Sequence, residues 1–340
     1  GISYAAVRVI QSILGSLVLL FVYAICKKVF DCRVGLVAAG IACIYPGFIG
    51  YSGLLLPQLL AMFLISLFVL LALNFNKSIF MAMILGIIAG YACLIRPELV
   101  LFFIIAFLAM IFINKDKTER KKIFKLGILM IVAMFFVISV WTIRNYKVSN
   151  RFILISSHGG DTVWLSTWKE EWLEWQDKEP LVSILNGRTN SEASKDLFKA
   201  GINNVKEHPF IYLKMCAKRP YRLWLTGHSN VFYSMQDSIK NYFINKTYGI
   251  FFIKVLMLFF NTLMVLIGFY GMGLAYIKSS QNRNYIRYIA FPILFFMVLH
   301  FFTWATPRYA IPIMPFVIIF ASYAIVDYFQ KKRTQHGCVL

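Results

Sequence analysis

Three arginines lie beside apolar segments, where they could bind the phosphate group of a lipid. Arg96 and Glu98 stand between two apolar runs, Arg144 follows another, and Arg308 precedes the last one. A guanidinium has planar, forked donors that match phosphate oxygens, so three arginines on one side of a membrane would form a cradle for an anionic headgroup. Arg96 also has a second interpretation, an arginine that reaches the membrane surface and pairs with its neighbouring carboxylate.

Other polar residues are candidates for substrate contacts or for acid/base chemistry. Glu98, His158 and Asp161 could transfer protons, although sequence spacing fixes no partner for any of them. His158 and Asp161 belong to the sequence SSHGGD, whose two glycines suit a tight turn against a sugar or phosphate, or an ordinary loop. His300 would complete the cradle. Further contacts to the sugar or the acceptor are expected from Tyr51, Gln58 and Tyr309.

Familiar catalytic and nucleotide-binding motifs are absent from the sequence. It contains no P-loop, no Rossmann fingerprint, no zincin motif and no nucleophile elbow. The six cysteines and five histidines form no ligand-spaced cluster, so we expect no structural zinc site. Candidate chemistry is therefore confined to polar residues at the ends of the apolar segments.

The apolar segments are long enough to cross a membrane. Hydrophobic residues make up 59% of the 340, and 15% are charged, whereas about a quarter would be charged in a soluble domain. A helix needs roughly 20 apolar residues to cross the hydrocarbon core. The sequence predicts an all-α, polytopic membrane protein. About nine transmembrane helices are expected, at residues 3–26, 34–50, 55–73, 78–95, 97–113, 123–142, 249–277, 285–304 and 308–329.

Basic residues are concentrated in the short joints between these segments. The net charge is +20, and the densest run, KDKTERKKIFK, separates two predicted helices. Such clusters are typical of cytoplasmic loops, so membrane topology explains the charge, with attraction to anionic lipids as a secondary explanation. We therefore expect no nucleic-acid partner. The joints near 27–33, 74–77, 114–122 and 278–287 are predicted to be cytoplasmic, together with the C-terminus.

The same alternation predicts a multi-pass protein of the cell membrane with one large extracytoplasmic segment. Residues 1–142 and 249–340 would hold the transmembrane helices, and residues 143–248 a mostly helical outer domain. The loops near 51–54, 96–98 and 305–307 would face the same outer side.

Within the outer domain, helical spacing is predicted for residues 191–207 and 210–225, with a break at His208-Pro209. Four tryptophans would share one helical face, either as a packing face or as a helix lying on the lipid headgroups. They are Trp164, Trp168, Trp172 and Trp175.

Several segments, taken in order, resemble the integral-membrane GT-C glycosyltransferases of the family 39 type, the group of protein O-mannosyltransferases and aminoarabinose transferases. The segments are YSGLLLPQLLAMFLISL, GIIAGYACLIRPELVLF, WTIRNY, SSHGGDTVW, EHPFIYL and RYAIPIMP. The resemblance implies an enzyme that transfers a sugar from a polyprenyl-phosphate donor to a protein, lipid or glycan acceptor on the outer face of the membrane. Arg96, Arg308 and Arg144 would then bind the donor phosphate.

The resemblance also implies a catalytic acidic residue in the first external loop and, in some members, dependence on Mg²⁺ or Mn²⁺. The first basic joint follows the first helix, and residue 1 is not methionine, so we expect that loop and at least one helix ahead of residue 1. The catalytic base would then lie outside this sequence. Gln58 stands where relatives commonly carry glutamate.

Two other functions share parts of this pattern. A transporter or lipid flippase would place polar groups in the middle of the membrane and break its helices there, whereas the polar groups here gather on one face. A polysaccharide polymerase or ligase would have the same topology and the same active side. Only the family resemblance separates it from a glycosyltransferase of the family 39 type.

Overall fold

The computed structural model describes residues 3–113, 117–168, 184–189, 192–227, 229, 235 and 237–335. These residues form helices, turns and loops without a β-strand, and helix covers most of each predicted apolar segment. The helices are α1 (Tyr4–Val29), α2 (Cys32–Ile44) with α3 (Pro46–Ser52), α4 (Gln58–Leu73), α5 (Ile79–Ile95), α6 (Leu99–Ile113), α7 (Lys117–Ser149), α13 (Tyr248–Lys278), α14 (Arg283–Phe302) and, after the 3₁₀ turns η3 (Pro307–Tyr309) and η4 (Ile311–Ile313), α15 (Met314–Gln335). The predicted all-α polytopic architecture is confirmed.

The described helices differ in their ability to cross a membrane alone. Five are long and apolar enough, namely α1, α7, α13, α14 and the helix that includes α15. The pair α2 and α3, bent by 54°, meets the same criteria only when its two helices are taken together, as a broken span or a re-entrant loop. α4, α5 and α6 are apolar but have 16, 17 and 15 residues. At about 1.5 Å per residue they fall short of a hydrocarbon core of about 30 Å. They depend on their neighbours to bury their polar ends.

Local sequence fixes where several helices begin. Asp31 caps α2 by accepting a hydrogen bond from the Val34 amide at 2.8 Å, and Ser78 caps α5 through the Met81 amide at 3.1 Å. Pro46 occupies the first turn of α3, where a missing amide proton costs nothing. Because the residue before a proline is disfavoured in a helix, the chain bends between α2 and α3.

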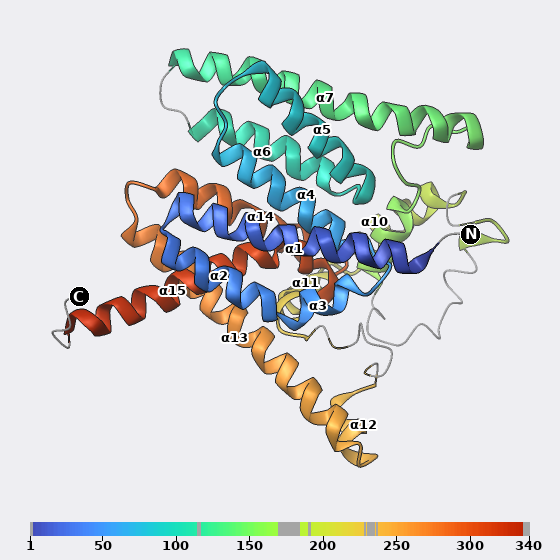
Figure 1. Cartoon of the computed structure of the whole chain (residues 1–340). Coiled ribbons are helices and arrows are strands. Elements are labelled where there is room, and N and C mark those ends of the chain that lie inside the picture. Colours follow the sequence, from blue (N-terminus) through green and yellow to red (C-terminus); the bar gives the residue numbers. More distant parts are fainter. Residues whose placement is uncertain are drawn as a thin grey trace.

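Glycines allow two helix pairs to approach closely. A Cβ on Gly86 of α5 would lie 2.4 Å from the Met130 carbonyl oxygen of α7. A Cβ on Gly271 of α13 would lie 2.0 Å from the Phe320 carbonyl oxygen of α15. Helices in lipid associate through such small residues because no hydrophobic effect drives them together there. α5 with α7 and α13 with α15 are therefore close-packed pairs of the bundle (Figure 1).

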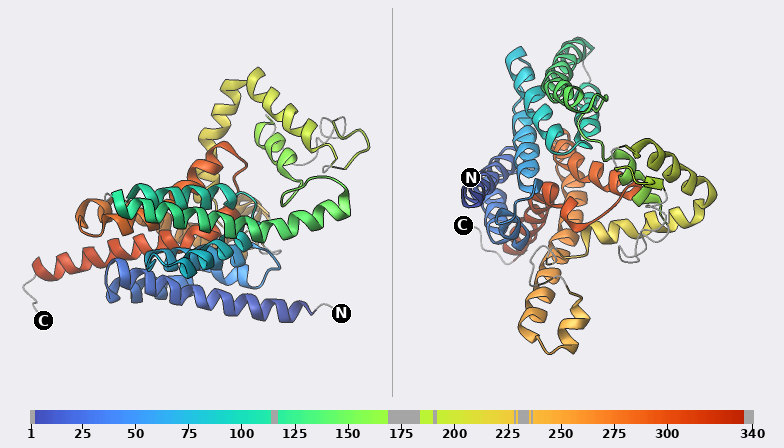
Figure 2. Two further views of the ribbon diagram at one scale, coloured as in Figure 1. Left: turned by 90° about the horizontal axis from the view of Figure 1, so that it is seen from above. Right: turned by 90° about the vertical axis from the view of Figure 1, so that its right-hand side faces the viewer.

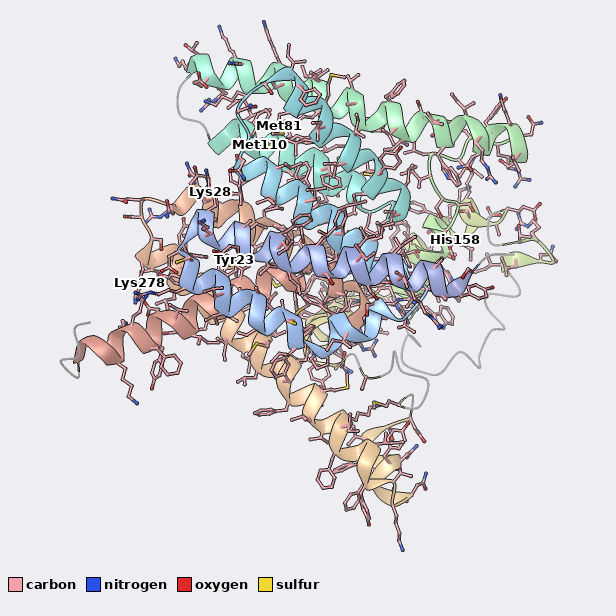
Figure 3. The ribbon with its side chains drawn as sticks, viewed as in Figure 1. Tyr23, Lys28, Met81, Met110, His158 and Lys278 are labelled. Carbon is pink, nitrogen blue, oxygen red and sulfur yellow. The ribbon has the colours of Figure 1, made fainter. Side chains whose placement is uncertain are left out.

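The two ends of the bundle differ chemically. Figure 3 shows Lys28 and Lys278 at one end and His158 at the other. The Lys28 ammonium lies 6.0 Å from the centre of the Tyr285 ring, so the joint after α1 meets the start of α14. We call this the Lys278 end, and the opposite end, where α14 finishes and η3 follows, the Tyr309 end. The predicted cytoplasmic joints thus gather at the first and the predicted outer loops at the second.

The polar segment contains the helices α8 (Gly159–Thr167), α10 (Ser194–Glu207), α11 (Pro209–Trp224) and α12 (Ile239–Ile244). Figure 2 shows α8, α10 and α11 grouped beside the bundle. α10 and α11 confirm the helices predicted there, and His208 separates them. α7 continues to Ser149, beyond the predicted boundary at residue 142.

The tryptophan face can be followed for two of its four members. The rings of Trp164 and Trp168 are stacked, with centroids 5.3 Å apart, and Trp164 is buried against Leu197 of α10. These two form a packing face. Trp172 and Trp175 lie outside the described residues.

The close approach of α13 and α15 is testable with two neighbouring glycines. Gly271→Val should destabilise the detergent-solubilised protein by about 1–3 kcal/mol, because the new side chain overlaps the Phe320 backbone. Gly273→Val is the matched control, since a Cβ there meets no atom within 4 Å. Thermal unfolding of the two variants measures the difference. Equal unfolding temperatures would contradict the packing.

Candidate functional site

Tyr309 is the centre of a cluster of cationic and aromatic side chains. The guanidinium carbon of Arg96 lies 4.9 Å from the centre of its ring and that of Arg308 lies 5.1 Å away. The His300 ring stacks on the same side chain, with a centroid distance of 4.8 Å and an interplanar angle of 7°. The end of α5 therefore meets a segment far from it in sequence, the end of α14 with the following turn η3, at one aromatic ring.

Arg96 is buried, and it ends α5 because a proline follows it. Its Nε donates to Glu98 Oε1 at 2.6 Å, and its Nη2 lies 2.5 Å from the same oxygen. The guanidinium also lies 5.7 Å from the centre of the Phe296 ring. Arg308, in contrast, is exposed, and it donates to the Tyr309 hydroxyl at 3.3 Å. The cluster thus reaches from the interior to the surface.

His300 has one ring nitrogen satisfied and one without a described partner. Its Nδ1 lies 2.9 Å from the Trp304 carbonyl oxygen, which can only accept, so Nδ1 carries the proton. In the neutral imidazole Nε2 is then an acceptor, and it is buried without a hydrogen-bond partner. His300 can therefore receive a hydrogen bond from a hydroxyl group.

Several buried polar atoms around Tyr309 have no hydrogen-bond partner among the described residues. Buried polar atoms without a described partner include Arg96 Nη1, His300 Nε2 and Thr306 Oγ1. An unmet buried polar group costs about 1–3 kcal/mol and usually indicates a bound water, ion or ligand. Two donors and one acceptor around Tyr309 suit a ligand that combines phosphate oxygens with hydroxyl groups.

Tyr51 and Gln58 are buried near the same end. The charges of Arg308 and Arg96 both act on the Tyr51 hydroxyl, so Tyr51 belongs to the neighbourhood of the cluster. Gln58 is the first residue of α4, and α4 packs on η4, the turn that follows Tyr309. The Oε1 atom of Gln58 has no described partner. Both therefore remain candidates for contacts with a sugar or an acceptor.

Arg144 is placed differently from the other two predicted arginines. Its guanidinium lies 5.0 Å from the centre of the Trp141 ring and donates to Asn145 Oδ1 at 3.2 Å, both on its own helix. Asn145 in turn donates to the Ile155 carbonyl at 3.2 Å and holds the loop after α7. These contacts give Arg144 a role at the exit of α7, and none of them ties it to Tyr309.

His158 and Asp161 form a pair of their own at the start of α8. His158 Nδ1 lies 3.3 Å from Asp161 Oδ2, with the histidine side chain 72% exposed and the aspartate 17%. Gly160 faces α10, since a Cβ there would lie 1.9 Å from the Ser194 carbonyl oxygen. This glycine serves helix packing, and the predicted tight turn against a ligand is replaced by the first turn of α8.

Arg219 of α11 is a buried arginine that our sequence analysis did not single out as a site residue. It donates to the Phe301 carbonyl at 3.1 Å, and a second nitrogen donates to the Ser166 carbonyl. Tyr212, seven residues earlier on the same helix face, donates to the Phe302 carbonyl at 2.8 Å. In the sequence, the only indication of this role is that Tyr212 and Arg219 stand seven residues apart in a basic, aromatic segment with helical spacing. Together they fix the polar segment to the last turn of α14, beside His300.

The described residues do not fit a divalent metal site. In the described ranges no three His, Cys, Asp or Glu side chains are grouped to hold a metal ion. Mg²⁺ binds through oxygen ligands, and Glu98, the carboxylate that contacts the cluster, is already paired with Arg96.

Residues 1–141, about two-fifths of the chain, match the family model described as dolichyl-phosphate-mannose-protein mannosyltransferase. No curated protein has a significantly similar sequence. Among solved structures, the archaeal oligosaccharyltransferase AglB from Archaeoglobus fulgidus is similar over 98% of this chain, at 16% identity and a TM-score of 0.54. That structure contains an inhibitory peptide and a dolichol-phosphate.

A second structure of the archaeal enzyme, tethered to an acceptor peptide with an NVT sequon, has a TM-score of 0.53 at 17% identity. A third, in complex with Zn and sulfate, also has a TM-score of 0.53. The chain has the GT-C fold. The resemblance to GT-C membrane glycosyltransferases is thereby confirmed, and the chain spans about 40% of the length of the archaeal chains.

The junction between the polar segment and the GT-C bundle can be tested with Tyr212 and Arg219. Tyr212→Phe should cost about 1 kcal/mol, because it removes one neutral hydrogen bond. Arg219→Met should cost more, because it leaves the Phe301 and Ser166 carbonyls without their donor. Hydrogen exchange of the α11 amides should accelerate in the same order. Unchanged exchange in Arg219→Met would show that other contacts hold α11.

Proposed function

We propose that this chain is the membrane portion of a glycosyltransferase that takes a sugar from a polyprenyl-phosphate donor. The acceptor is a protein, lipid or glycan on the outer side of the membrane. The Tyr309 cluster carries the proposal, because it combines two arginines with unmet hydrogen-bonding groups at one end of an apolar bundle. The family match and the GT-C fold support the same reaction class.

Arg96 and Arg308 would bind the donor phosphate. Sugar transfer breaks the bond between the anomeric carbon and the phosphate oxygen, so negative charge grows on the phosphate as the acceptor attacks. Fixed cations at that position stabilise the transition state more than the ground state. Arg96 is held against Tyr309 and Glu98 and needs no reorganisation, while exposed Arg308 can close on the phosphate from the surface.

His300 would bind a hydroxyl of the sugar or the acceptor through Nε2. The Trp304 carbonyl fixes the protonated nitrogen, and stacking on Tyr309 fixes the plane of the ring. Tyr51 and Gln58 would contribute further contacts from α3 and α4. None of the described residues is assigned as the catalytic base.

The orientation follows from charge. The Lys278 end contains the basic joints, so by the positive-inside rule it would face the cytoplasm and the Tyr309 end the outside. The polar segment would then form an extracytoplasmic domain beside the phosphate site, fixed there by Arg219 and Tyr212. An acceptor would approach from that side.

A transporter is not favoured. Among the described residues the buried charged side chains are Arg96, Arg219 and Lys254, and they lie at a helix end, in the polar segment and in the second turn of α13. Transporters concentrate such groups near the middle of the bilayer, in broken helices. The arrangement here suits chemistry at one membrane surface.

The proposal predicts that the two cluster arginines are required for transfer in the full-length protein. Arg96→Lys keeps the charge but loses the planar fork, and Arg308→Ala removes the surface cation. Each should lower the rate of sugar transfer from polyprenyl-phosphate mannose, tested as the first donor, roughly 10- to 100-fold. The assay measures labelled sugar transferred in membranes containing equal amounts of each variant.

Arg151→Ala is the matched control, since Arg151 is an exposed arginine of the polar segment whose described ion pair, with Glu192, is 3.8 Å long. Its transfer rate should equal that of the unaltered protein. Wild-type rates in both cluster variants would refute the site assignment. If no tested donor supports transfer, stabilisation by polyprenyl phosphate alone, lost in Arg308→Ala, still tests the phosphate site.

His300→Phe tests the second part of the site. The variant keeps an aromatic ring against Tyr309 but loses the Nε2 acceptor and the Nδ1 donor to Trp304, so transfer should fall about tenfold and stability by about 1 kcal/mol, as for one neutral hydrogen bond. Binding of polyprenyl phosphate without a sugar should be unaffected, because the phosphate contacts remain. Full transfer activity in this variant would remove His300 from the proposed site.

A further inference from the structure

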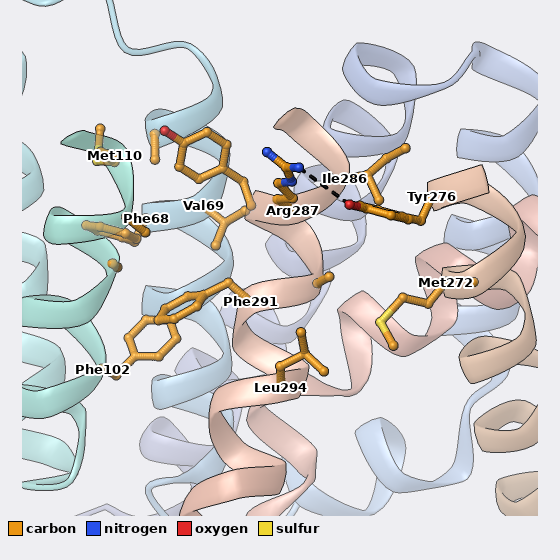
Figure 4. A pocket seen from close by; sticks show the side chains of 16 residues that line it. Phe68, Val69, Phe102, Met110, Met272, Tyr276, Ile286, Arg287, Phe291 and Leu294 are labelled. Atoms are coloured by element: carbon orange, nitrogen blue, oxygen red, sulfur yellow. Dashed lines mark hydrogen bonds between the residues drawn. The ribbon is translucent and has the colours of Figure 1, made fainter. Parts of the chain in front are cut away.

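A cavity of about 650 Å³ lies beside the first half of α14, whereas the Tyr309 cluster lies at the end of this helix (Figure 4). Its walls come from α4, α6, α13 and α14 and are formed by side chains such as Phe68, Phe102, Met272, Phe291 and Leu294. The volume is typical of ligand sites, about 300–1,000 Å³. Apolar walls of this kind suit a hydrocarbon chain.

The polar groups of the cavity gather at one end. Figure 4 shows Arg287 and Tyr276 facing each other above the apolar walls, with Arg287 Nη2 donating to the Tyr276 hydroxyl at 3.4 Å. The guanidinium carbon of Arg283 lies 5.3 Å from the centre of the same Tyr276 ring, and its buried Nε has no described partner. The cavity is therefore amphipathic, with a long apolar part and a cationic rim.

No described carboxylate neutralises this rim. At the Lys278 end Asp327 lies 2.5 Å from Lys278, and Glu119 is paired with Lys77. No ion pair of Arg283 or Arg287 is found among the described residues. Both arginines stand in the first turns of α14, which has no acidic residue and no side-chain cap there. The positive end of the helix dipole adds to their charge, so the rim favours an anion.

We propose that this cavity binds an anionic phospholipid, with an acyl chain between Phe68, Phe102 and Phe291 and its phosphate on Arg287 and Tyr276. The site is separate from the proposed sugar-transfer site and does not depend on that function. Arg287 and His300 lie on one helix about 20 Å apart, from a rise of about 1.5 Å per residue. A donor phosphate at Tyr309 could not also contact Arg287, so the two ends would face lipids of opposite leaflets.

Native mass spectrometry of the full-length protein tests the proposal. After delipidation, dioleoyl-phosphatidylglycerol should bind at least tenfold more tightly than dioleoyl-phosphatidylcholine. Arg287→Ala should reduce the ratio of the two affinities about tenfold, because a charge-assisted hydrogen bond to the phosphate is lost. Lys27→Ala is the matched control, since Lys27 is an exposed cation of the last turn of α1 and does not line the cavity.

The apolar part is tested with a glycine pair. A Cβ on Gly273, which lines the cavity, meets no atom within 4 Å, and the same holds for exposed Gly40 of α2. Gly273→Leu should therefore fill the cavity and weaken phosphatidylglycerol binding about tenfold, whereas Gly40→Leu should not. Equal binding of the two lipids, or equal binding by Gly273→Leu and Gly40→Leu, would overturn the proposal. Comparable loss in Lys27→Ala would show nonspecific charge attraction and would also overturn it.

Discussion

The stacking of Arg96 on Tyr309 is the contact on which the proposed site depends. Two guanidinium groups lie within 5.1 Å of one ring centre, and Glu98 is paired with one of them, that of Arg96. The two positive charges repel each other, although Glu98 offsets the charge of Arg96 and solvent weakens the field of exposed Arg308. In the proposed site, a phosphate that accepts hydrogen bonds from both guanidinium groups would remove the remaining repulsion.

Helix ends bring this contact about. α5 ends before Arg96 because a proline follows that residue, and α14 ends at Phe302. The chain then turns in η3, which places Tyr309 against both helix ends. The short helices α4, α5 and α6 could not hold such ends at a membrane surface alone. Close packing of α5 on α7 through Gly86 sets the position of Arg96. The site is thus a product of where helices end and how closely their neighbours approach.

The apolar segments were predictable from sequence because crossing hydrocarbon demands a fixed length of apolar residues. Their alternation also placed Arg96 and Arg308 at one end correctly. Arg144 stands near the end of α7, and its side chain contacts Trp141 and Asn145 of the same helix. The side of the membrane on which a residue lies does not determine which way its side chain points around the helix axis, so the sequence could not show this. Arg219 was overlooked as a site residue because its partners are backbone carbonyls distant in sequence, which no side-chain pattern reveals.

Arg219 and Arg96 are the two buried arginines of the described residues, and their partners differ in kind. Arg219 is the most deeply buried arginine of the described residues, yet two of its nitrogens donate to carbonyls of α14 and α8, which accounts for its burial. Arg96 is almost as buried, but its Nη1 has no described partner and faces a cluster that contains a free acceptor on His300. A buried cation costs several kcal/mol unless its donors are used. In the proposed site a phosphate would accept from the remaining donor of Arg96, whereas the described partners of Arg219 are backbone carbonyls, and this difference supports placing the phosphate at the Tyr309 cluster.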